Sequence, residues 1–95
     1  MLFPQQTPRA YARSNVEALN KNQMGVYGTF KQGLWVYVGK GDIRQRLLDH
    51  LNGDNPCITK QGPTHWVDEV TNGDLSAREK QLIAELNPVC NQKTG

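Results

Sequence analysis

Three short segments of the chain have the hydrophobic pattern of strands. Residues 25–30 and 34–39 are rich in Val, Tyr, Trp and Phe. In residues 64–70, the set His65, Val67 and Glu69 alternates with the set Trp66, Asp68 and Val70, as on the two faces of a strand. Polar residues and a glycine separate the first two segments at 31–33, as in a tight hairpin turn. We therefore expect an antiparallel hairpin and, later in the chain, a third strand.

The length of the hairpin turn decides which residues of its strands face each other. A three-residue loop at 31–33 pairs Tyr27 directly with Tyr37, so that both rings point to the same face of the sheet. A two-residue loop at 32–33 would instead place the two tyrosines on opposite faces. We expect the three-residue loop. Three valines then lie on the other face, suited to a core: Val26, Val36 and Val38.

The segment before the hairpin is predicted to be helical at 8–21, in one piece or two. Pro8 suits the first position of a helix, and Ser14-x-x-Glu17 is a capping-box pattern. The chain then divides into an N-terminal extension, partly helical, a folded domain and a polar tail: 1–23, 24–91 and 92–95.

Two further helices follow the hairpin. The first begins after Asp42, which can cap it, and ends at Asn52-Gly53. The last covers 77–86 behind the capping residue Ser76, and the polar segment 53–63 is predicted to be a loop. The expected fold is an α+β domain with a three-stranded antiparallel sheet flanked by helices.

Composition and charge narrow the class of protein only slightly. The net charge of +2 over 95 residues is weak support for an acidic partner. No apolar run approaches the ~18 residues of a membrane span, and the N-terminus lacks a targeting pattern, so we expect a soluble, cytoplasmic protein. In that compartment Cys57 and Cys90 are expected to be reduced thiols, and the spacing of Cys and His does not favour structural zinc.

Glu79 is the first candidate for chemistry. It lies on the inward apolar stripe of its helix, together with Leu82, Ile83 and Leu86. An ionised carboxylate that faces inward needs a partner, and a divalent cation is one such partner. The alternative is structural, because Ser76-x-x-Glu79 is itself a capping box.

Arg46 and His50 lie four residues apart, along one side of the same predicted helix. Arg46 suits bidentate phosphate binding, and equally suits a solvated surface position. His50 lies at the edge of the apolar stripe, where a hydrogen-bonded boundary histidine is the alternative to a catalyst. Tyr27 and Tyr37 are equally suited to packing, with their hydroxyls in water.

Taken together, the order of these residues resembles the GIY-YIG nuclease family. Gly25-Val26-Tyr27 and Tyr37-Val38-Gly39 look like the two tripeptides that name the family, each with valine in place of isoleucine. The resemblance covers 24–91 and implies a small three-stranded antiparallel sheet with flanking helices. The other matching elements follow in the family's order: Lys40-Gly41, Arg46-Leu47-x-x-His50, Glu79 and Pro88-x-x-Asn91.

The resemblance implies a divalent-metal-dependent endonuclease that hydrolyses phosphodiester bonds in DNA. By the match, Tyr27 activates or positions the attacking water, and Tyr37 lines the same pocket. Arg46 stabilises the transition state, and His50 relays the proton. A covalent tyrosine-phosphate intermediate is the rival role for Tyr27.

The remaining matches concern the metal, the pocket and the DNA. Glu79 matches the metal-binding glutamate and implies Mg²⁺ or Mn²⁺ as cofactor, and Asn91 matches an asparagine that shapes the pocket. Lys40 and Arg44 are expected to hold the DNA backbone. Because 95 residues leave little room for a DNA-recognition domain, we expect loose sequence preference, a structure-selective substrate or a separate targeting protein as partner. The alternative function is a nuclease-like module that binds nucleic acid or protein without cutting.

Overall fold

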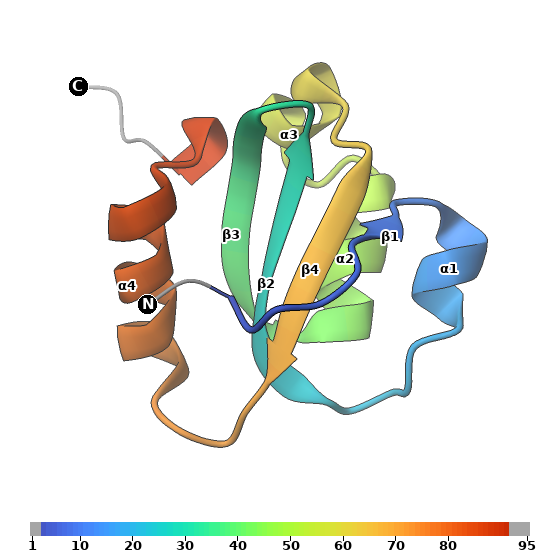
Figure 1. Ribbon diagram of the computed structural model, residues 1–95. Helices are drawn as coiled ribbons and strands as arrows, with labels where there is room; N and C mark the ends of the chain where they lie inside the picture. Colours follow the sequence, from blue (N-terminus) through green and yellow to red (C-terminus); the bar gives the residue numbers. More distant parts are fainter. Residues whose placement is uncertain (1–2, 92–95) are drawn as a thin grey trace.

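A four-stranded antiparallel sheet runs through the centre of the molecule, with helices on both of its faces (Figure 1). The computed structural model describes residues 3–91, and the polar tail predicted at 92–95 lies outside them. In sheet order the strands are β1 (Arg9–Ala10), β4 (His65–Val70), β2 (Met24–Lys31) and β3 (Leu34–Asp42). The helices are α1 (Arg13–Glu17), α2 (Ile43–Leu51), α3 (Pro56–Gln61), α4 (Leu75–Leu86) and the 3-10 turn η1 (Val89–Asn91).

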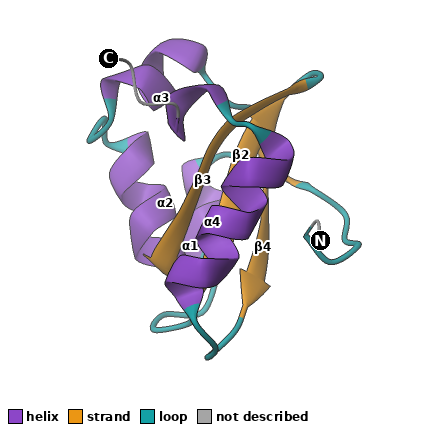
Figure 2. Ribbon diagram, turned by 90° about the vertical axis from the view of Figure 1, so that its left-hand side faces the viewer, coloured by secondary structure: helices purple, strands orange, loops and turns teal. Residues whose placement is uncertain are grey.

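Two apolar clusters pack on opposite faces of this sheet. On one face, the side chains of α1 and α2 pack against β2 and β4: Val16, Tyr27, Ile43, Leu47 and Trp66. On the other face, α4 covers β2 and β3 through Val26, Val38 and Leu82 (Figure 2). The predicted placement of Val26 and Val38 on one face of the sheet is confirmed. Among residues 3–91, no helix has the length and apolar character of a membrane span.

The sheet has a fourth strand that the sequence pattern did not predict. Arg9–Ala10 pairs with His65 and Trp66 of β4, so the prediction of helix over 8–21 is wrong at this point and α1 covers five residues. The short strand satisfies backbone groups along an otherwise exposed edge of β4. Helical propensity is overridden here by a contact with residues more than fifty positions away in the chain. The predicted extension 1–23 also supplies Val16 to the core.

The hairpin turn is shorter than we predicted. Lys31 pairs with Leu34, which leaves the two-residue turn Gln32-Gly33, and Gly33 takes a positive φ of 67°. Such turns favour glycine because a side chain is disfavoured at positive φ. The predicted three-residue loop and the direct pairing of Tyr27 with Tyr37 are therefore wrong.

A change of register nevertheless returns the two tyrosines to one face. Between Thr29 and Phe30 the pairing shifts by one residue, so that Thr29 lies opposite Tyr37 and Tyr27 lies opposite Gly39. Because residues two apart on a strand share a face, Tyr27, Thr29 and Tyr37 point the same way. The ring centroids of Tyr27 and Tyr37 are 6.3 Å apart.

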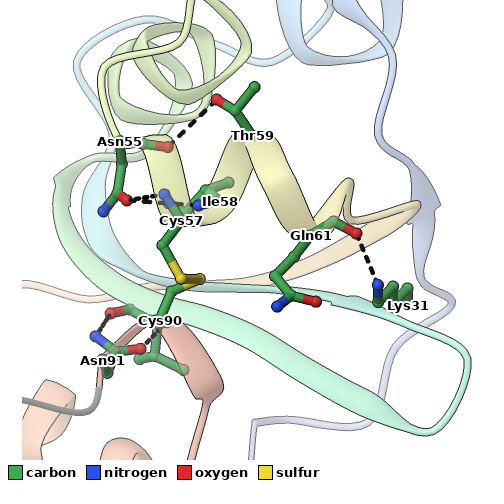
Figure 3. The surroundings of a disulfide bond; sticks show 9 residues. Lys31, Asn55, Cys57, Ile58, Thr59, Gln61, Cys90 and Asn91 are labelled. Carbon is green, nitrogen blue, oxygen red and sulfur yellow. Dashed lines mark hydrogen bonds between the residues drawn. A yellow bond between two sulfur atoms is a disulfide. The ribbon is translucent and has the colours of Figure 1, made fainter. Parts of the chain in front are cut away.

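The segment predicted as a loop at 53–63 contains α3. Asn55 caps this helix by accepting hydrogen bonds from the backbone N–H groups of Cys57 and Ile58, and Pro56 takes the first helical position (Figure 3). An asparagine followed by a proline is a sequence pattern typical of the start of a helix. The helix is short and mostly polar, so the apolar periodicity used for the other helices did not reveal it.

A disulfide between Cys57 and Cys90 joins α3 to η1 (Figure 3). The Cα atoms of the two residues are 5.7 Å apart, within the range that a disulfide spans. The prediction of reduced thiols is therefore wrong. It rested on an assumed compartment, whereas the pairing depends on the fold bringing together residues 33 positions apart.

Candidate active site

Tyr27 and His50 meet inside the molecule, at the interface of β2 and α2. The Tyr27 hydroxyl lies 2.7 Å from His50 Nε2. Tyr27 is fully buried and His50 is 3% exposed. Opposite Tyr27 stands Gly39, where a Cβ would collide with the Tyr27 hydroxyl, so the glycine of the second tripeptide makes room for the phenol. The two tripeptides are thus spatial partners.

The other ring nitrogen of His50 contacts Asp54, which our sequence reading did not single out. Nδ1 of His50 lies 2.7 Å from Oδ1 of Asp54. Asp54 follows α2 and is placed by Gly53, whose φ of 86° turns the chain back toward the helix. His50 and Asp54 are four residues apart, a spacing that brings side chains together on a helix. Because the predicted helix ends at Asn52-Gly53, before Asp54, this spacing did not indicate a contact.

Arg46 lies one turn before His50 on α2 and contacts the same group of residues. Its guanidinium pairs with Asp49 at 3.0 Å and with Asp54 at 3.6 Å. Its positive charge also acts on the buried Tyr27 phenol. Burial raises the pKa of the Tyr27 phenol well above its ordinary value of 10, while the nearby Arg46 lowers it in part. The interior phenol is therefore neutral at neutral pH.

Tyr37 lies on β3, at the outer side of this group, and is half-buried. Its ring meets the His50 ring edge-on, with centroids 5.2 Å apart. Burial raises the pKa of the Tyr37 phenol, the charge of Glu79 raises it further, and Arg46 lowers it. Tyr37 is thus in the electrostatic field of both Glu79 and Arg46, and it is more accessible than Tyr27.

Glu79 reaches this region from α4, on the opposite face of the sheet. The capping box predicted from Ser76 is wrong, because α4 begins at Leu75 and is capped by Asp74, which accepts from the backbone N–H of Ala77 at 3.0 Å. Glu79 therefore has no capping role. Its Oε1 instead lies 3.3 Å from Nζ of Lys40, on β3.

The two remaining predicted residues differ in their positions. Asn91 in η1 hydrogen-bonds the backbone of Val38, next to Tyr37 in β3. Arg44 instead donates from Nε to the backbone carbonyl of Glu17 at 3.4 Å, and its described contact is with α1 rather than with the tyrosine cluster.

No cluster of metal-binding side chains is present in the described part of the chain. Within residues 3–91, no three side chains from His, Cys, Asp and Glu gather in a way that could hold an ion. The predicted ligand Glu79 is paired with Lys40. One carboxylate is compatible with Mg²⁺, which is commonly held by one or two carboxylates, with water and substrate phosphate completing its shell.

No protein-family model matches the sequence, and no curated protein matches it significantly. Among solved structures, the chain is similar to the GIY-YIG N-terminal endonuclease domain of UvrC from Thermotoga maritima, a point mutant bound to its catalytic divalent cation. The sequences are 22% identical, the match covers 85% of this chain and 94% of that one, and the TM-score is 0.72. The protein therefore has the fold of a GIY-YIG endonuclease domain.

Proposed function

We propose that this protein is a divalent-metal-dependent endonuclease that hydrolyses phosphodiester bonds in DNA. One observation supports the proposal: two phenols and an imidazole pack together beside a guanidinium, and the carboxylate of Glu79 is near enough to Tyr37 for its charge to act on that phenol. They are the residues that the sequence resemblance named: Tyr27, Tyr37, Arg46, His50 and Glu79.

Tyr37, rather than Tyr27, is the phenol that we propose to position the attacking water. Tyr27 is fully buried and its hydroxyl already contacts His50, so water has no access to it without a rearrangement. Tyr37 is half-buried and lies between the charges of Arg46 and Glu79. We therefore assign Tyr27 to support, holding His50 and Arg46 in place.

The cations and the carboxylate match the charge that develops during phosphodiester hydrolysis. Negative charge builds up on the nonbridging oxygens and on the leaving oxygen. Arg46 can donate to the nonbridging oxygens, because its guanidinium is partly exposed while its inner side is held by Asp49 and Asp54. Glu79 would hold the divalent metal, which when bound supplies positive charge for the leaving oxygen.

Lys40 and Arg44 are proposed to hold the DNA backbone. Lys40 is 42% exposed at the side chain even while paired with Glu79, so its ammonium remains accessible to a phosphate. Each phosphate neutralised by such a residue makes binding weaker as salt rises. Target selection by a separate protein remains part of this proposal.

A plasmid-nicking assay with Mg²⁺ tests the function. Glu79→Ala and Arg46→Ala are each expected to lower the cleavage rate by about 10²- to 10³-fold, the usual cost of losing a preorganised charge partner. Glu17→Ala, which removes an exposed carboxylate from α1, is the control and should cleave like the native chain. Equal cleavage by all four proteins would overturn the site assignment. Salt-dependent binding to DNA, with no cleavage of any DNA form, would favour a binding module instead.

A further inference from the structure

We propose that Asp54 is a positioning residue that sets the hydrogen-bond direction through His50 and Tyr27 and, with its second carboxylate oxygen, holds Arg46 in place. The inference rests on the proposed nuclease function for its effect on the rate. Asp54 contacts both His50 and Arg46, and His50 in turn contacts Tyr27.

The direction of each hydrogen bond follows from what the groups can donate. A carboxylate only accepts, so the 2.7 Å contact between Asp54 Oδ1 and His50 Nδ1 requires the ring proton to be on Nδ1. In the neutral imidazole, Nε2 then carries a lone pair. It faces the Tyr27 hydroxyl at 2.7 Å, and the phenol must therefore donate to it.

The opposite tautomer conflicts with the Asp54 contact. With the proton on Nε2, His50 would donate to Tyr27, and the lone pair of Nδ1 would face the Asp54 carboxylate oxygen at 2.7 Å. Two acceptors would then meet with no hydrogen between them, and His50 is too buried for water to separate them easily. One tautomer of His50 is thus compatible with Asp54 at its observed place.

The second oxygen of Asp54 contacts Arg46. Oδ2 of Asp54 lies 3.6 Å from Nη2 of Arg46, while Asp49 holds Nη1 at 3.0 Å. The side chain of His50 is 1% exposed, and its neighbours are Tyr27 from β2, Tyr37 from β3 and Asp54. Among these neighbours, Tyr27 can either donate or accept a hydrogen bond, whereas the Asp54 carboxylate can only accept. Asp54 therefore decides which ring nitrogen carries the proton.

The first test reads the tautomer of His50 directly, by ¹⁵N NMR of the imidazole at a pH where the ring is neutral. The native protein is expected to show the Nδ1–H form, and Asp54→Ala is expected to lose that preference. Asp49→Asn is the matched control, since it removes a carboxylate from the same Arg46 without touching His50, and it should keep the Nδ1–H form. Circular dichroism and a thermal melt check that each variant is folded. An Nδ1–H form that persists in folded Asp54→Ala, or an Nε2–H form in the native protein, would overturn the proposal.

The second test reads the consequence for catalysis with the isosteric variant Asp54→Asn. Asp54 uses one oxygen for His50 and the other for Arg46, and in asparagine one of these positions becomes an NH₂ group, which only donates. We expect kcat to fall by up to about 100-fold with little change in KM, the size of effect that a small misplacement of a catalytic group produces. Native kcat in both Asp54 variants would contradict the inference. If the native protein cleaves no DNA, the proposed function fails, and the tautomer measurement still decides the role of Asp54.

Discussion

The side-chain amide of Asn91 pairs with both backbone polar groups of Val38. The Val38 N–H donates to Oδ1 at 2.7 Å, and Nδ2 donates to the Val38 carbonyl at 2.9 Å. Since β3 is an edge strand, its outward backbone groups have no neighbouring strand. Asn91 takes the place of that neighbour for one residue and fastens the C-terminal turn beside Tyr37.

Replacing Asn91 should therefore destabilise the fold. Asn91→Ala removes both hydrogen bonds, and Asn91→Asp keeps the acceptor but places a carboxylate against the Val38 carbonyl. Each is expected to lower the free energy of unfolding by about 1–3 kcal/mol, measured by urea denaturation. Asn72→Ala, at an exposed position, is the control and should change it by less than ~0.5 kcal/mol. Native stability in both Asn91 variants would show that the pairing contributes nothing.

Reduction of the Cys57–Cys90 disulfide should lower stability. The bond limits the freedom of the unfolded chain, and loops of this size typically gain about 2–4 kcal/mol of unfolding free energy from closure. Urea unfolding with and without dithiothreitol measures the effect. The double variant Cys57→Ser, Cys90→Ser should resemble the reduced protein and ignore the reductant. An unchanged unfolding midpoint for the native chain in reductant would contradict the prediction.

Stability should also fall at alkaline pH, through the buried phenol of Tyr27 and the partly buried phenol of Tyr11. Burial raises the pKa of Tyr11 and of Tyr27 in the folded protein, and Tyr11 donates a hydrogen bond to the Leu47 carbonyl at 2.7 Å. An unfolded tyrosine titrates at about 10, so above this pH the unfolded chain has lost protons that the folded chain retains. The stabilisation is therefore complete below about pH 10 and declines as the pH rises above it.

The measurement is the free energy of unfolding in urea, over a pH series that crosses the unfolded tyrosine pKa. Tyr11→Phe and Tyr27→Phe should each flatten the alkaline decline, because each removes one of the phenols whose pKa differs between the two states. Tyr37→Phe should flatten it less, since the pKa of Tyr37 is raised less than those of Tyr11 and Tyr27. An identical decline in the native protein and in the Tyr11 and Tyr27 variants would be inconsistent with these pKa shifts.

Lys40 should compete with a metal ion for Glu79. Their ion pair spans 3.3 Å at a partly exposed position, where such pairs contribute about 0–1 kcal/mol. Lys40→Ala is thus expected to raise the affinity for Mn²⁺ in the absence of DNA by up to about fivefold, measured by calorimetry. Glu79→Gln should abolish this binding. Lys80→Ala, which removes an equal charge from α4, is the control, and an equal gain there would assign the effect to net charge instead.

The main elements of the fold could be predicted from the sequence because they depend on local patterns. The hairpin strands, α2 behind Asp42 and the third predicted strand at 64–70 all lie where alternation and capping residues placed them. A period of two or of 3.6 residues is a property of neighbouring positions, so it can be read without knowledge of the rest of the fold.

Tertiary structure decided the features that join distant positions. The shift of register in the hairpin, the pairing of Arg9–Ala10 with β4 and the disulfide each depend on which segments meet. The contact of Asp54 with His50 is close in sequence, but it requires the chain to turn back at Gly53.

The two tyrosines illustrate the division between these levels. The sequence pattern placed Tyr27 and Tyr37 on one face through a direct pairing that does not exist, whereas the sheet reaches the same result through a shorter turn and a register shift. Local chemistry determined which side chains were available for a site. Their partners, burial and charge environment were decided by packing, because these depend on the free energy of the whole fold rather than on adjacent residues.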